Sequence, residues 1–313
     1  MDQQKLRILA AMDGSEQSVD AALYAAKILP ADRAEMVLFH VLDKIPETYW
    51  DLEKFSPYRR RVIASHAWEM QQQQKIQDVL NRTRDAVVFA GFPEDAVKVV
   101  VQGRRVGTAR DIAFEALQEY DGVVVGRTGT SQLKDLVMGS IANKLVGRLE
   151  DAPICVVGGK PEVDKLLVAM DHSPGAMKCV DYVARMLAGS KCHVTLAHVI
   201  RALPPMGQEA ADEGFFQAMK EEVGRAREQM EFVMEDARSR LLKAGFAREK
   251  VDLRMVSDVP SRAVALVEEA RAGGCGGIVT GRRGLSRIQE FFMGRVSNKV
   301  LQLARDMAVW VVS

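Results

Sequence analysis

Two glycine-spaced segments, one in each half of the chain, have the residue types and spacing needed to hold a phosphate group. Both read Gly-x-x-Gly, nine further residues, then Gly; the glycines are Gly126, Gly129 and Gly139 in the first copy and Gly281, Gly284 and Gly294 in the second. Each copy follows a β-rich apolar run and leads into a helical pattern. Glycines at such a junction let backbone N–H groups approach a phosphate, and a helix N-terminus favours negative charge. The alternative is that they serve only as turn glycines, required by a positive φ or by tight packing.

The residues after the third glycine differ between the copies. Ser140 follows in the first, where its hydroxyl can donate to a phosphate oxygen or cap the helix. Arg295 follows in the second, where it can pair with a phosphate through two hydrogen bonds or fill the phosphate position. Two residues later stand Ala142 and Ser297, so each copy has one of two hydroxyls. We expect a nucleotide in the first half and leave the second open.

Charged residues accompany both segments. Arg127 in the first copy and Arg282 and Arg283 in the second either add positive charge to the site or are solvated surface arginines. Asp13 and Asp171 end matching apolar runs, where a buried carboxylate needs partners. They either bind a nucleoside or a magnesium ion through water, or cap the following helix.

The glycine copies belong to a repeat that spans the chain. Leu-Val-Ala-Met-Asp-His-Ser at 167–173 corresponds to Leu-Ala-Ala-Met-Asp-Gly-Ser at 9–15, an offset of 158, and the glycine segments follow at an offset of 155. Each half alternates strand and helix patterns, which predicts a parallel sheet with helices on both faces. The boundary is expected at Gly158-Gly-Lys-Pro161, which gives domains of residues 1–159 and 160–313. Ligands are expected beyond the carboxyl ends of the strands, where the strand order reverses.

Composition limits the class of protein. A length of 313 residues fits two domains, and a net charge of +1 argues against an extended nucleic-acid surface. The sequence has neither a signal-peptide pattern nor an apolar run long enough to span a membrane. The four cysteines lack metal-site spacing and are expected to be buried, reduced thiols of a cytoplasmic protein.

An Asp that closes strand one in Met-Asp-x-Ser, a His-Val that closes strand two, and Gly-x-x-Gly-x9-Gly-Ser after strand four resemble the universal stress protein family. The chain resembles a tandem member of that family. The resemblance implies two Rossmann-like α/β domains, each with a five-stranded parallel sheet in the order 3-2-1-4-5. It also implies an intramolecular pseudo-dimer through the two fifth strands, with further homodimerisation left open.

Many members of the family bind ATP, and magnesium would accompany the ATP. The resemblance places the phosphates at Gly126, Gly129, Gly139 and Ser140, and the nucleoside near Asp13 and the backbone of Val41.

Three functions compete at this point. The first is an ATP-binding sensor or regulator in the stress response, with slow hydrolysis at most because no water-activating base stands out. The second is a partner-binding scaffold with vestigial pockets and an unidentified partner. The third is an enzyme of a related nucleotide α-hydrolase class. Such enzymes have a Ser-Gly-Gly-x-Asp-Ser loop after strand one, and Met12-Asp-Gly-Ser15 of this chain lacks its double glycine. His40 and His198, which end matching strands, are interpreted as structural residues.

Overall fold

Apolar strands alternate with amphipathic helices in both halves, as the sequence pattern predicts. The computed structural model describes residues 5–43, 59–129, 138–201, 213–284 and 293–313. The chain forms two compact units that divide between Gly158 and Gly159, apart from residues 28–30, which are grouped with the second unit. Each unit is described separately below.

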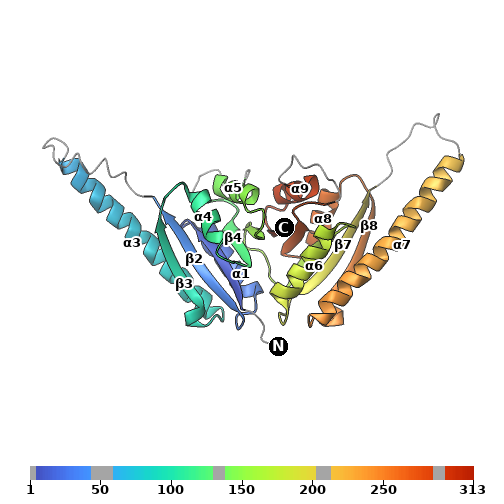
Figure 1. Cartoon of the computed structure of the whole chain (residues 1–313), viewed down its shortest axis with the longest axis horizontal. Coiled ribbons are helices and arrows are strands. Elements are labelled where there is room, and N and C mark those ends of the chain that lie inside the picture. The colour runs from blue at the N-terminus through green and yellow to red at the C-terminus, as the bar shows by residue number, and fades with distance from the viewer. Residues whose placement is uncertain (1–4, 44–58, 130–137, 202–212, 285–292) are drawn as a thin grey trace. The chain divides into compact units, whose positions relative to one another are not determined.

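The first unit contains a five-stranded parallel sheet in the order β3-β2-β1-β4-β5. Its strands are β1 (Leu6–Met12), β2 (Ala34–Leu42), β3 (Val97–Gly103), β4 (Gly122–Gly126) and β5 (Ile154–Val157). Its helices are α1 (Glu16–Ile28), α3 (Arg59–Phe89), the 3-10 turn η2 (Glu94–Ala96), α4 (Thr108–Ala116) and α5 (Ser140–Arg148). The long α3 lies against β2 and β3, whereas α4 and α5 pack together (Figure 1). The predicted strand order is confirmed.

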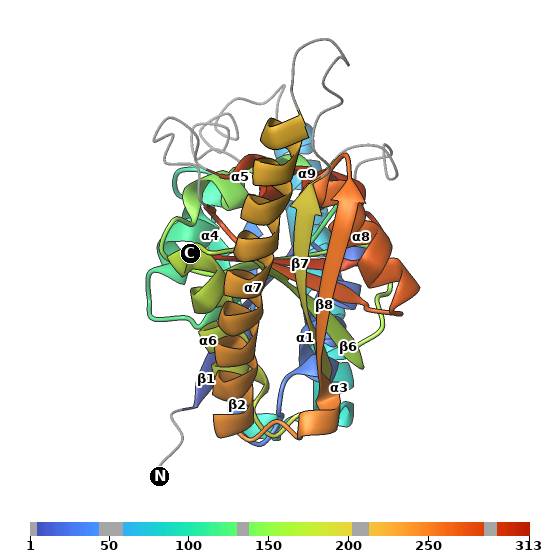
Figure 2. The same cartoon turned by 90° about the vertical axis from the view of Figure 1, so that its right-hand side faces the viewer.

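The second unit repeats this arrangement in the order β8-β7-β6-β9-β10. Its strands are β6 (Lys165–Met170), β7 (His193–Arg201), β8 (Val251–Val259), β9 (Gly277–Gly281) and β10 (Ala308–Val312). Its helices are α6 (Pro174–Leu187), α7 (Glu213–Lys243), the 3-10 turn η3 (Arg248–Lys250), α8 (Arg262–Ala272) and α9 (Arg295–Leu303). Helices α6 and α7 pack together, as do α8 and α9, and Figure 2 shows α7 running along β7 and β8.

The cores of both units consist of strand residues and the inner faces of the helices. Strands β4 and β10 are buried along their whole length, as expected for parallel strands covered on both faces. All four cysteines are buried free thiols, as predicted. Burial raises the pKa of Cys192 to about 12. No helix that the structure describes is both long and apolar enough to cross a membrane.

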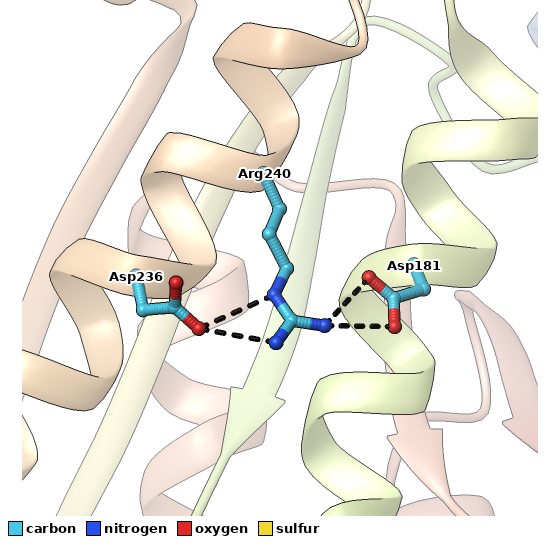
Figure 3. A network of polar contacts seen from close by, with 3 residues as sticks. All are labelled: Asp181, Asp236 and Arg240. Carbon is cyan, nitrogen blue, oxygen red and sulfur yellow. Dashed lines mark hydrogen bonds and ion pairs between the residues drawn. The ribbon is translucent and has the colours of Figure 1, made fainter.

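A polar network holds the long helix α7 against α6. Arg240 of α7 donates two hydrogen bonds to Asp181 of α6, at 3.1 and 3.0 Å, and also contacts Asp236 one turn away at 3.2 Å (Figure 3). The bonds to Asp181 raise the pKa of Arg240 above its already high ordinary value. This network ties the C-terminal part of α7 to α6.

Candidate functional site

In the first unit the structure brings Asp13 and Gly129 together, although 116 positions separate them in the sequence. Asp13 follows β1, and Gly129 lies in the loop after the neighbouring strand β4. One carboxylate oxygen of Asp13 accepts from the Ser15 N–H at 2.9 Å and from the Ser15 hydroxyl at 2.5 Å. The other oxygen faces Gly129 so closely that a Cβ added at that glycine would collide with it.

The second unit has the same arrangement at Asp171 and Gly284. Asp171 accepts from the Ser173 N–H at 2.9 Å and from the Ser173 hydroxyl. A Cβ at Gly284 would lie 2.9 Å from its other carboxylate oxygen. The repeat therefore preserves a carboxylate that faces the glycine loop at the carboxyl ends of two adjacent strands.

These carboxylates do not cap the following helices directly, so that alternative is wrong in its simple form. The serines are the caps: the Ser15 hydroxyl accepts from the Ser18 N–H at 3.2 Å, and the Ser173 hydroxyl accepts from the Ala176 N–H at 3.3 Å. Each aspartate orients a capping serine with one oxygen and directs the other at the loop. Asp13 is exposed and Asp171 is half-buried.

The site glycines are required by close packing and not by a positive φ, because none of the six is among the described residues with φ above zero. A Cβ at Gly126 would lie 2.9 Å from the Gln17 carbonyl at the start of α1. A Cβ at Gly281 would lie 3.3 Å from the Gly175 carbonyl group at the start of α6. The glycines therefore allow the loop after the fourth strand to lie against the first helix.

The third glycine closes the loop in both units. The Gly139 N–H donates to the Arg127 carbonyl at 2.8 Å, and the Gly294 N–H donates to the Arg282 carbonyl at 2.7 Å. Gly139 and Gly294 are the N-cap residues of α5 and α9, and neither offers a capping side chain. Ser140 is therefore the first residue inside α5 and not its cap, which corrects that alternative. Its side chain is exposed.

Ser297 lies on the wall of the cavity described below, but its hydroxyl is largely occupied by bonds within the protein. It is 4% exposed, and its hydroxyl donates to the Gly281 carbonyl at 2.7 Å and lies 3.0 Å from the Thr280 hydroxyl. The corresponding pair in the first unit is Val125 and Ala142, both buried and apolar. The Ser297 proton is thus committed to the protein, and only its lone pairs remain for other partners.

The arginines of the two segments divide into two groups. Arg127 and Arg282 are buried, so the interpretation as solvated surface arginines is wrong for them. Arg282 donates through Nε to the Ser313 hydroxyl at 3.2 Å. Arg283 and Arg295 are exposed and lie on the wall of a cavity.

Both strand-end histidines make the same bond, as their interpretation as structural residues predicts. Nδ1 of His40 lies 2.8 Å from the Met12 carbonyl, and Nδ1 of His198 lies 2.8 Å from the Met170 carbonyl. Burial lowers the pKa of His198, and the nearby His172 and Arg262 lower it further. The hydrogen bond to the Met170 carbonyl acts in the opposite direction and raises this pKa, but it does not outweigh burial. The ring of His172 meets that of His198 edge-on at 6.1 Å.

A cavity of about 720 Å³ lies at the carboxyl ends of the strands of the second unit. Its wall includes Asp171, Val199, Gly281, Gly284 and Gly294, so the structure brings the predicted residues of this unit together around one space. The volume falls within the usual range for small-molecule sites. Val199 corresponds to Val41, which is a buried residue of β2 in the first unit.

Among the residues that the structure describes, six cationic side chains and a single carboxylate, that of Asp171, line this cavity. The cations come from five segments: Arg201, Arg227, Arg262, Arg283, Arg295 and Lys299. Four of them, Arg201, Arg227, Arg262 and Lys299, were missed by sequence reasoning, because they lie in different elements with no shared motif. Two had a positional signal: Arg201 ends β7 and Arg262 is the first residue of α8.

Metal ligands are sparse. No group of three or more His, Cys, Asp and Glu side chains that could hold a metal is found in the described part of the chain. A magnesium ion bound here would rely on the phosphates of its nucleotide, with Asp13 or Asp171 as the nearest carboxylate from the protein.

Comparisons with known proteins agree with this geometry. The model of the universal stress protein family matches residues 6–155 and again residues 162–313. Comparison with curated protein sequences gives no match.

Two solved structures that share the fold match nearly the whole chain. A universal stress protein from Archaeoglobus fulgidus DSM 4304 is 16% identical with a TM-score of 0.57, over 98% of each chain. The functionally unknown protein PA1789 from Pseudomonas aeruginosa PAO1 is 14% identical with a TM-score of 0.55, over 99% of this chain and 93% of that one. A universal stress protein solved in complex with cAMP is 21% identical with a TM-score of 0.34, over 48% of this chain and 96% of that one. These likenesses concern the fold.

Proposed function

Because the chain belongs to the universal stress protein family, we propose that it binds adenine nucleotides, ATP above all, and acts in the stress response as a nucleotide sensor or regulator. The observation that supports this most is the duplicated carboxylate that faces a glycine loop at the carboxyl ends of adjacent strands. In such sheets, ligands bind where the strand order reverses. Asp13 and Asp171 stand at this point of their units.

The glycine loops and the two aspartates each have a role in this proposal. The glycine loops bring backbone N–H groups near the phosphates, and the N-termini of α5 and α9 add favourable partial charge. The aspartate oxygen that does not bind serine accepts a hydrogen bond from a nucleoside hydroxyl. Magnesium accompanies the nucleotide and neutralises part of its phosphate charge.

Binding is favoured over rapid turnover. Among the described residues around the cavity, Asp171 is the single carboxylate, and one of its oxygens already accepts two bonds from Ser173. His198 directs Nδ1 at the Met170 carbonyl. Neither is arranged as a strong general base, so hydrolysis is slow at most.

The remaining features of the proposal concern organisation. Domains of residues 1–159 and 160–313 are proposed to pair within the chain through β5 and β10, which would cover two sheet edges. The protein is proposed to act in the cytoplasm.

Equilibrium binding of labelled ATP, measured both with excess magnesium and in EDTA, tests the two sites. Gly129→Val and Gly284→Val should each remove one nucleotide, because the new side chain would displace the facing carboxylate. Gly147→Val is the control, because a Cβ there meets nothing within 4 Å. Equal stoichiometry for all three variants and the wild type would refute the assigned sites.

Thermal unfolding gives a second readout. A ligand at one hundred times its Kd stabilises the folded state by about 2.7 kcal/mol. ATP, ADP and cAMP should be compared in this assay. No shift with any of them would favour the scaffold function instead.

A further inference from the structure

The two units differ most in the charge around their sites. Four arginines on the second cavity wall are Arg201, Arg262, Arg283 and Arg295. At the corresponding positions of the repeat, the first unit has Asp43, Thr108, Thr128 and Ser140. These correspondences rest on matching places in the fold, since Thr108 and Arg262 begin α4 and α8, and Ser140 and Arg295 begin α5 and α9.

The arginines surround the space from several sides. Arg283 and Arg295 stand beside the glycine loop after β9, whereas Arg201 and Arg262 follow β7 and β8. Lys299 of α9 donates to the Ser261 hydroxyl just before α8 at 3.4 Å, which brings a further cation between these groups. The cations therefore line the cavity from the end of β7, from the starts of α8 and α9 and from the loop after β9.

A local irregularity in β7 distinguishes the end of this strand from that of β2. The pairing of β7 with β8 shifts register between Val199 and Arg201, whereas β2 pairs regularly with β3 through Leu42. Such bulges re-aim side chains and occur next to binding sites. Here the shift lies directly before the arginine on the cavity wall.

Opposing negative charge is scarce. Among the described residues, one of the six cations has an ion pair, Arg227 with Glu231 at 3.6 Å. Asp171 is the only carboxylate on the described cavity wall. By contrast, Asp43 in the first unit is held at 2.7 Å by Arg104. The second cavity thus carries a large excess of positive charge before any ligand enters.

We propose that the second unit binds a nucleoside polyphosphate as the metal-free anion, with arginines in place of a divalent cation. This inference rests on the proposed nucleotide-binding function and deepens it for one of the two sites. Guanidinium groups form paired, charge-assisted hydrogen bonds with phosphates. A magnesium ion entering with the nucleotide would be repelled by the same wall, and it would lower the ligand charge that the wall attracts. The first unit lacks these arginines, so its site requires magnesium.

Calorimetric titration of the full chain in EDTA and in excess Mg²⁺ tests this. In EDTA the wild type should retain one ATP site, with affinity in the order ATP, ADP, AMP. Excess Mg²⁺ should weaken that site and restore the other. Arg283→Thr/Arg295→Ser, which installs the residues of the first unit, should weaken metal-free ATP binding about 100-fold or more, since a hydrogen bond to a charged group contributes roughly tenfold or more.

Arg248→Ser removes one positive charge from an exposed position outside the cavity, the same loss as in Arg295→Ser alone, and should change affinity less than about twofold. Arg295→Ser alone provides a milder variant, whose fold is checked by its unfolding midpoint. The inference is overturned if ATP binds only with Mg²⁺. It is also overturned if the double variant binds metal-free ATP with the same affinity as Arg248→Ser. Both results would leave the proposed nucleotide binding intact. If no nucleotide binds under either condition, the proposed function is overturned as well.

Discussion

The buried hydroxyl pair of Thr280 and Ser297 offers a test of whether Ser297 supports the fold or contacts the ligand. Both side chains are 4% exposed, and their hydroxyls lie 3.0 Å apart. Ser297 also donates to the Gly281 carbonyl at 2.7 Å. The perturbations are Ser297→Ala, Thr280→Val and the double substitution, which recreates the Val125 and Ala142 pair of the first unit.

The expected magnitudes follow from the bonds that each change removes. Ser297→Ala removes two hydrogen bonds and leaves a buried Thr280 hydroxyl without that partner, which should cost about 2–3 kcal/mol. Thr280→Val removes the bond to Ser297 and the longer 3.4 Å bond from the Thr280 hydroxyl to the Gly281 carbonyl, while Ser297 keeps its own bond to that carbonyl, which should cost about 1 kcal/mol. The double substitution also removes the Thr280 hydroxyl, which Ser297→Ala leaves with only the 3.4 Å bond. It should therefore cost no more than Ser297→Ala alone, with a coupling of about 1 kcal/mol.

Scanning calorimetry and denaturant unfolding provide the assay. Ser297→Ala should lower the Tm of the second unit by about 5–10 °C. ATP affinity of the double variant should stay within about twofold of wild type, because the Ser297 proton is already committed to the Gly281 carbonyl. Strictly additive losses would refute the coupling. A stable double variant that loses ATP binding more than tenfold would refute the structural role and restore Ser297 as a ligand residue.

Two further predictions concern the first unit. Gly126→Ala should destabilise it by about 1–3 kcal/mol in urea unfolding, because the new methyl group would lie 2.9 Å from the Gln17 backbone. Gly147→Ala, where a Cβ meets nothing within 4 Å, should instead stabilise it by about 0.5–1 kcal/mol, and equal effects would contradict the packing argument. Burial would raise the pKa of Asp111, but N–H donors including those of Arg105 and Val106 lower it below 3.8. The ionised Asp111 carboxylate therefore stabilises the folded state above its unfolded pKa, and this contribution is lost as the pH falls through its folded pKa. The difference in unfolding free energy between wild type and Asp111→Asn should narrow from pH 6 to pH 3. A constant difference would contradict this.

Sequence reasoning predicted the fold because the signals that set it are local and repeated. Apolar strand runs, Met-Asp-x-Ser and the glycine spacing occur twice at matching offsets, and the strand order follows the family that these motifs indicate. The closeness of Asp13 and Gly129 was also within reach, since adjacent parallel strands end at the same edge of the sheet.

Side-chain roles that depend on packing could not be predicted in this way. The bond from Ser297 to the Gly281 carbonyl depends on how α9 packs against the end of β9, and the two residues lie 16 positions apart in the sequence. The burial of Arg282 depends on the position of Ser313. The basic wall of the second cavity gathers residues from several elements, so it becomes visible only when the strands and helices are placed.

The hydroxyl pair also constrains the order in which the two halves diverged. If an ancestral repeat carried Val and Ala at these positions, a threonine arriving first would face a methyl group and would have only its 3.4 Å bond to the Gly281 carbonyl. A serine arriving first would reach the same carbonyl at 2.7 Å. The lower-cost order is therefore serine before threonine.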